Sequence, residues 1–174
     1  MDWLTVIVAS LSIVFLLLAA LNDIATRLIP NCLPIALAVL GVATRLMTGP
    51  TALGLSCAVA LGVFALLLLL HARGALGGGD VKLAAAVCLG LSPFAAWRFI
   101  VITSLAGGVL AILHILGRRA FSGSGTIAPA PNGSALLTRV LRTERWRIAR
   151  HGSLSYGVAI ACGGIWAIVE SRGF

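Results

Sequence analysis

Acidic residues are scarce in this sequence: five of its 174 residues are aspartate or glutamate, and 10% of all residues are charged. A soluble domain carries about 25% charged residues, so the composition excludes an ordinary soluble protein. Hydrophobic residues make up 60% of the chain, and the mean hydropathy is +1.08. We therefore predict an all-α fold, a polytopic membrane bundle of about six transmembrane helices, with residues 1–174 forming a single membrane-embedded domain.

Cysteine is rare too, with four residues that lie far apart in apolar sequence, namely Cys32, Cys57, Cys88 and Cys162. No two of them form a C-x-x-C pair of the kind that structural zinc sites contain. We expect the four thiols to pack as small apolar groups between helices. The sequence predicts neither a bound metal nor a cofactor.

Six apolar segments are candidates for spanning helices: residues 3–21, 32–47, 51–70, 82–96, 99–116 and 153–169. The first has no basic n-region and no small-residue cleavage site, so we interpret it as a span and not as a signal peptide. The fourth is short and contains Pro93. Its small residues favour close contact with other helices over exposure to lipid: Ala84, Ala85, Ala86 and Gly90.

The thirteen basic residues are unevenly distributed along the chain. Seven lie in one stretch between the last two apolar segments: Arg118, Arg119, Arg139, Arg142, Arg145, Arg147 and Arg150. Placing that stretch in the cytoplasm puts ten basic residues inside and three outside, in agreement with the positive-inside rule. Both termini are then outside, and the loops after the first and third segments face the cytoplasm.

The basic cytoplasmic loop, at about residues 117–152, joins a Gly-, Ser- and Pro-rich linker to the stretch ALLTRVLRTERWRIAR. In that stretch most apolar residues share one helical sector and most arginines lie opposite. Two interpretations stay open, a helix lying on anionic lipid and a solvated basic loop. The lipid bilayer is an expected partner. Nucleic acid is not, because the basic residues come with no aromatic interleaving and no recognisable binding module.

Two aspartates stand out under this topology. Asp23 lies just past the first span and Asp80 just before the fourth, so both are expected at the cytoplasmic face. An ionisable residue at the rim of a span is costly and is a functional candidate by default. The alternatives are structural: Asp80 could pair with Lys82 or Arg73 or cap a helix, and Asp23 could pair with Arg27.

Three glycines precede Asp80 in the stretch GALGGGDVKLAAA. Glycine permits backbone conformations and close approaches that are closed to other residues. One glycine would suffice for a tight entry into a helix. Three in a row favour a backbone that must accommodate an extended peptide.

Two carboxyls that are held together resist joint ionisation, because the charge of one raises the pKa of the other. One carboxylate can act as general base on water, while the other, protonated, polarises a substrate carbonyl and assists the leaving amine. Asp23 and Asp80 together therefore suit peptide-bond hydrolysis. A Ser–His site is the weaker alternative, since His71, His114 and His151 lie in unrelated contexts and two of them, His71 and His151, look like headgroup-level residues.

These residues resemble the type 4 prepilin peptidases, a family of membrane-embedded aspartic proteases. GGGD followed by VK matches the signature G-x-G-D-x-K. NDIATRLIPN is similar to the first catalytic segment of the family, an aspartate followed by a basic residue and an I-P-N turn. The late stretch LSYGVAIACGG looks like the last helix of the family, with Ser155 where proline is common. The resemblance extends from Asp23 to Gly164.

The resemblance implies that Asp23 and Asp80 are the catalytic pair, with Gly77, Gly79, Lys82, Arg27, Pro30 and Asn31 as supporting motif residues. It also implies that the enzyme removes the leader peptide from prepilin or pseudopilin precursors at the cytoplasmic face of the bacterial inner membrane. The chain lacks the cysteine-paired cytoplasmic insertion of larger members and resembles the small form associated with Flp or Tad pili. N-methyltransferase activity is therefore not expected.

Three other functions stay open from the sequence: a presenilin-like intramembrane protease, which shares G-x-G-D; a transporter in which rim carboxylates carry ions; and a structural membrane subunit. The sequence does not define which pilin is cleaved or the oligomeric state.

Overall fold

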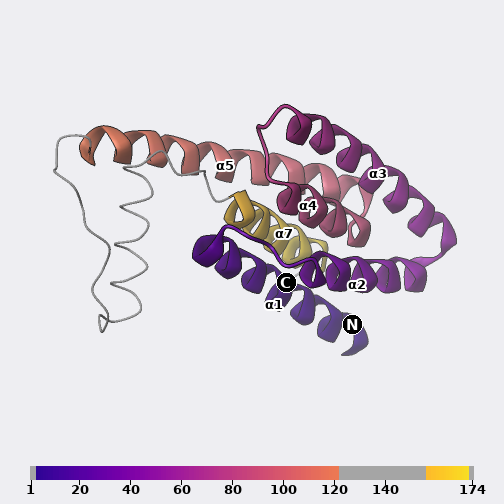
Figure 1. Ribbon diagram of the computed structural model, residues 1–174. Helices are drawn as coiled ribbons and strands as arrows, with labels where there is room; N and C mark the ends of the chain where they lie inside the picture. Colours follow the sequence, from indigo (N-terminus) through magenta and orange to yellow (C-terminus); the bar gives the residue numbers. More distant parts are fainter. Residues whose placement is uncertain (1–2, 122–155, 173–174) are drawn as a thin grey trace. The chain divides into compact units, whose positions relative to one another are not determined.

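The computed structural model describes residues 3–121 and 156–172, and these form six helices (Figure 1). The helices are α1 (Trp3–Thr26), α2 (Cys32–Thr48), α3 (Pro50–Ala72), α4 (Gly78–Gly90), α5 (Pro93–Phe121) and α7 (Tyr156–Arg172). The described ranges contain no strand, which confirms the predicted all-α fold.

Three of these helices are long and apolar enough to cross a membrane: α1, α3 and the Pro93–Leu116 part of α5. Helices α2 and α7 are shorter apolar helices. Helix α4 has 13 residues, about 20 Å at 1.5 Å per residue, which is less than the ~30 Å hydrocarbon core. The described helices are compatible with a membrane helical bundle, in which α4 is the shortest of the described helices.

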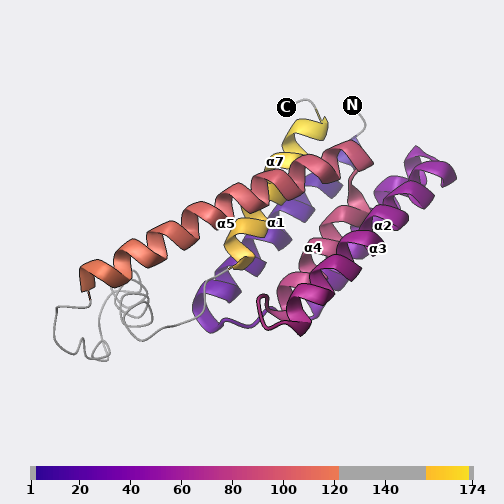
Figure 2. The same ribbon diagram turned by 90° about the horizontal axis from the view of Figure 1, so that it is seen from above.

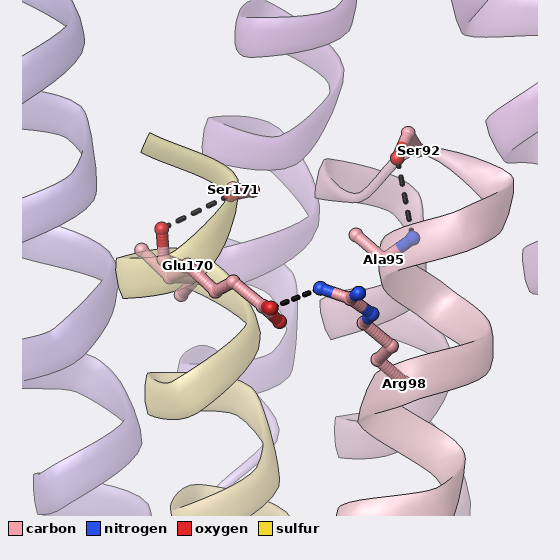
Figure 3. A network of polar contacts seen from close by, with 6 residues as sticks. Ser92, Ala95, Arg98, Glu170 and Ser171 are labelled. Carbon is pink, nitrogen blue, oxygen red and sulfur yellow. Dashed lines mark hydrogen bonds and ion pairs between the residues drawn. The ribbon is translucent and has the colours of Figure 1, made fainter. Parts of the chain in front are cut away.

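The predicted fourth segment, residues 82–96, was wrong in its boundaries. Helix α4 ends at Gly90, and Pro93 is the first residue of α5. Proline at the first position of a helix loses no internal hydrogen bond, because the first amides have no partner there. Ser92 caps the new helix, since its Oγ accepts a hydrogen bond from the Ala95 amide (3.2 Å; Figure 3).

Helix α4 is the centre of the packing, in contact with α2, α3 and α7 (Figures 1 and 2). Two side chains of α4, Leu83 and Cys88, are fully buried. A methyl group on Gly41 of α2 would lie 2.7 Å from the backbone nitrogen of Gly90, so the two helix backbones touch. Small residues in α4 therefore serve close helix contact, as the sequence predicted.

A buried hydroxyl also joins α3 to the end of α4. Ser56 is fully buried, and its Oγ donates a 2.7 Å hydrogen bond to the carbonyl of Leu91. The last carbonyls of a helix have no partner within it, and such a group is costly to bury alone. Ser56 satisfies one of them and fixes the C-terminal end of α4 against α3.

The contacts divide the chain into two compact units, Met1–Ala106 with Ser155–Phe174, and Gly107–Leu154. Helix α5 passes from the first unit into the second. In the second unit the structure describes only the end of α5, so residues 122–152 of the predicted basic loop and their possible amphipathic helix lie outside the described residues. The site described below lies in the first unit.

Glu170 joins the last turn of α7 to α5. Its carboxylate forms an ion pair with Arg98 (Figure 3). The Arg98 guanidinium also lies 4.5 Å from the ring centroid of Phe94. Both charged side chains are about two-fifths exposed (42% and 40%). Such a pair contributes little stability, typically ~0.2–1 kcal/mol.

Candidate active site

The first expected site residue, Asp23, lies in the last turn of α1 and is 6% exposed. Its carboxylate accepts a 2.9 Å hydrogen bond from the backbone amide of Gly157, in the first turn of α7. Amides at a helix N-terminus have no partner in the helix and carry partial positive charge, so they stabilise a carboxylate. Helix α7 thus holds Asp23 from a position 134 residues further along the chain.

The contact with Gly157 requires glycine. A Cβ on Gly157 would lie 2.8 Å from Oδ2 of Asp23 and 2.9 Å from its Cβ. Gly157 was not among the site residues predicted from the sequence. The signal that could have found it was the Tyr156–Gly157 pair at the start of the last helix, which also belongs to the resemblance.

The second expected site residue, Asp80, lies in the first turn of α4 and is 8% exposed. The preceding α3 ends in a Schellman motif: the Gly74 amide donates to the His71 carbonyl and the Ala75 amide to the Leu70 carbonyl. Gly74 has the positive φ (+74°) that this motif requires. The chain then enters α4 through Gly77, whose amide donates a hydrogen bond to the carboxyl of Asp80.

Each of the three glycines before Asp80 has a neighbour within the chain. A Cβ on Gly77 would lie 2.8 Å from Oδ2 of Asp80, and one on Gly79 would lie 3.1 Å from Cβ of Ile29. A Cβ on Gly78 would be at ordinary contact distance, 3.4 Å, from the His71 ring. The close approaches that the glycines permit in the structure are therefore internal.

The I-P-N turn lies against the start of α4 and joins the two motifs. Ile29 packs on Gly79, and Nζ of Lys82 donates a 3.0 Å hydrogen bond to Oδ1 of Asn31. Lys82 thus anchors α4 to the start of α2 through Asn31. Pro30 lies in the non-helical stretch between α1 and α2, where it prevents the two from continuing as one helix.

The two aspartates interact electrostatically across this junction. Asp80 lies outside the three candidate spans. Burial, and next the negative charge of Asp23, raise the pKa of Asp80 to about 6, against the opposing effects of the Gly77 hydrogen bond and the Arg27 charge. Arg27 is therefore not only a neighbour of Asp23 along the chain; its positive charge also acts on Asp80. It follows α1 in a left-handed conformation (φ +58°) that residues other than glycine seldom adopt.

One oxygen of the Asp80 carboxyl has no hydrogen-bond donor among the described residues. Oδ1 of Asp80 is buried and accepts no hydrogen bond from the described residues. An unsatisfied polar atom at such a position is rare and calls for an explanation, and a reacting group is one. In residues 3–121 and 156–172, no cluster of three His, Cys, Asp or Glu side chains could hold a metal ion. The arrangement is a pair of buried carboxyls with unequal surroundings, which suits general acid–base chemistry on water.

A known protein family resembles the chain over more than half of its length. The model of the type IV leader peptidase family matches residues 10–112, a range that contains both aspartates. No curated protein and no solved structure matches the chain.

Proposed function

Because the chain belongs to the type IV leader peptidase family, we propose that it is an aspartic endopeptidase that removes the leader peptide from prepilin or pseudopilin precursors. Membership of a peptidase family favours this activity over transport or a purely structural role. The observation that carries the proposal is the pair of buried carboxyls, Asp23 and Asp80, which interact although 57 positions separate them. The cofactor-free chemistry of such a pair needs no group beyond water and the peptide.

In the proposed reaction Asp23 is the general base. The Gly157 amide stabilises its negative charge, so it can take a proton from a water molecule held between the carboxyls. The oxygen of that water attacks the carbonyl carbon of the peptide bond. Asp80, protonated, donates to the carbonyl oxygen through Oδ1, an atom that makes no hydrogen bond to any described residue.

The tetrahedral intermediate then collapses. The C–N bond breaks, the leaving nitrogen takes the proton that Asp23 had received, and Asp80 recovers its own proton as the carbonyl forms again. The products are a free amine and a carboxylic acid, and both side chains return to their starting states. This assignment matches the two surroundings, since burial and the charge of Asp23 favour the protonated form of Asp80.

The position of the pair favours cleavage close to the membrane surface. Asp23 is in the last turn of α1, Asp80 in the first turn of α4, and Gly157 in the first turn of α7. All three therefore lie at helix ends at one end of the bundle. By the charge distribution of the sequence this end faces the cytoplasm. A leader that precedes an apolar membrane segment presents its scissile bond at that depth, whereas a presenilin-like protease would cut within the apolar segment.

The test is to locate the cut. Purified full-length protein in detergent micelles is incubated with a membrane-inserted pilin precursor that carries a short basic leader, and the products are identified by mass spectrometry. We expect a single cut at the junction between the leader and the apolar segment. Cuts inside the apolar segment would instead support the presenilin-like alternative, and no cleavage of any pilin precursor would contradict the proposal.

A further inference from the structure

The histidine at the end of α3 makes a contact that the sequence did not reveal. Nδ1 of His71 lies 2.7 Å from the carbonyl oxygen of Leu76. Since a carbonyl can only accept, Nδ1 carries the hydrogen and donates it. The ring also covers Gly78, because a Cβ there would lie 3.4 Å from Cε1 of His71. His71 therefore reaches from α3 across the loop to the start of α4.

The peptide group between Leu76 and Gly77 is held from both sides. Its carbonyl oxygen accepts from His71, and its N–H donates to the carboxyl of Asp80. The two groups lie in one plane because the peptide bond is rigid. A rotation of this plane moves the N–H and the carbonyl together, so the hydrogen bond from His71 fixes the direction in which the N–H points at Asp80.

We propose that His71 is a positioning residue for Asp80, which acts through the Leu76–Gly77 peptide. It does not touch the substrate. It closes the five-residue loop between α3 and α4 and orients the amide that holds the acid. The inference rests on the proposed function, since it assumes that Asp80 is catalytic.

Its loss leaves the loop attached at its two ends and by the Schellman motif, which uses the His71 backbone and not its ring. The ring is exposed, so its removal opens no cavity in the core. We therefore expect altered catalysis in a protein that still folds. A displacement of a reacting group by about 1 Å can lower a rate about 100-fold.

Three substitutions separate the donor from the rest of the ring. His71→Asn places an amide nitrogen close to the position of Nδ1, His71→Gln places it one methylene further away, and His71→Leu has no donor. We expect kcat of His71→Asn to stay within about threefold of the unsubstituted protein and kcat of His71→Leu to fall by about 10- to 100-fold, with KM unchanged. His71→Gln should resemble His71→Leu. His114→Leu, on α5, serves as the control for loss of a histidine and should keep full activity.

The readouts are kcat and KM with the pilin precursor, together with the thermal unfolding midpoint in the same detergent. Full activity of His71→Leu would overturn the inference, and so would equal loss in His71→Asn and His71→Leu. A rise in KM alone would show that the ring contacts substrate instead, and a fall in midpoint that matches the fall in kcat would reduce its role to stability. Asp80→Asn is assayed in parallel: if that variant keeps its activity, the proposed function fails, whereas an inactive Asp80→Asn beside an active His71→Leu refutes only the inference.

Discussion

At the scale of single residues, the site consists of two carboxyls whose neighbours leave no room for side chains. Gly77 lies against the carboxyl of Asp80, and Gly157 lies against that of Asp23. Each glycine is also the residue whose amide donates to that carboxyl. Because these glycines have no side chain and their N–H groups donate to the carboxyls, each carboxyl is held directly against the backbone.

Substitutions in the glycine run test this relation. Gly77→Ala places a methyl group 2.8 Å from Oδ2 of Asp80, and the carboxyl has to move. We expect activity to fall about 100-fold, as for a misplaced reacting group. Gly78→Ala is the matched control, because its methyl group meets the His71 ring at an ordinary 3.4 Å. Cleavage rates and detergent unfolding midpoints of both variants are the measurement; equal activities would contradict the account of Gly77.

The Arg27 charge gives a prediction on pH. The site needs the proton on Asp80, whose pKa is raised to about 6, so kcat/KM should decline as the pH rises through that value. Arg27 opposes this rise, because a nearby positive charge favours the ionised carboxylate. In Arg27→Gln the pKa of Asp80 should therefore be higher, and the alkaline limb of the kcat/KM profile should move to higher pH. A limb that stays in place or moves to lower pH would show that Arg27 does not act on Asp80.

Two contacts at the site were not predicted from the sequence. Asp23, Asp80 and the motif residues stand out because acids are rare beside apolar segments and because the motifs are local. The contacts of Gly157 with Asp23 and of His71 with Leu76 depend on how α7 and the α3–α4 loop are placed. A histidine near a span end is most simply interpreted as a headgroup-level residue, and only its distance to Leu76 shows otherwise.

At the scale of helices, α4 carries Asp80 and packs on α2, α3 and α7. The position of α4 among these helices therefore determines the position of Asp80. The hydrogen bond between Lys82 and Asn31 fixes its first turns to α2, and that between Ser56 and Leu91 fixes the residue after its last turn to α3. The sequence indicated its small residues but placed its end too late. The pair Ser92–Pro93 is a helix start signal, and the apolar run across it concealed the break.

The contact between α2 and α4 yields a stability prediction. Gly41→Ala places a methyl group 2.7 Å from the backbone nitrogen of Gly90, which cannot move without shifting α4. Overpacking of this kind costs about 1–3 kcal/mol, so the unfolding midpoint in detergent should fall. Gly62→Ala on α3 has no atom within 4 Å of the added methyl group. Its midpoint should stay or rise, since alanine has the higher helix propensity, and a fall as large as that of Gly41→Ala would contradict this packing.

At the scale of the molecule, the two ends of the first unit differ. Asp23, Asp80 and Gly157 gather at one end, whereas Glu170 follows Gly157 by 13 positions along α7 and pairs with Arg98. At 1.5 Å per residue, that is about 20 Å away. Large apolar side chains, among them Ile7, Leu61 and Leu105, are exposed on the long helices, as suits contact with lipid. The first unit therefore holds its two buried acids at one end, and the exposed apolar side chains of its long helices suit contact with a bilayer.

The most direct measurement is cleavage of the pilin precursor by purified Asp23→Asn and Asp80→Asn. Each variant retains the shape of the side chain and loses the ability to exchange a proton. Glu170→Gln, at the other end of the unit, is the matched control and should cleave normally. If the two aspartates act as base and acid on one water molecule, each asparagine variant loses about 100-fold or more of the rate while its unfolding midpoint is retained. Full activity of either asparagine variant would contradict that reaction.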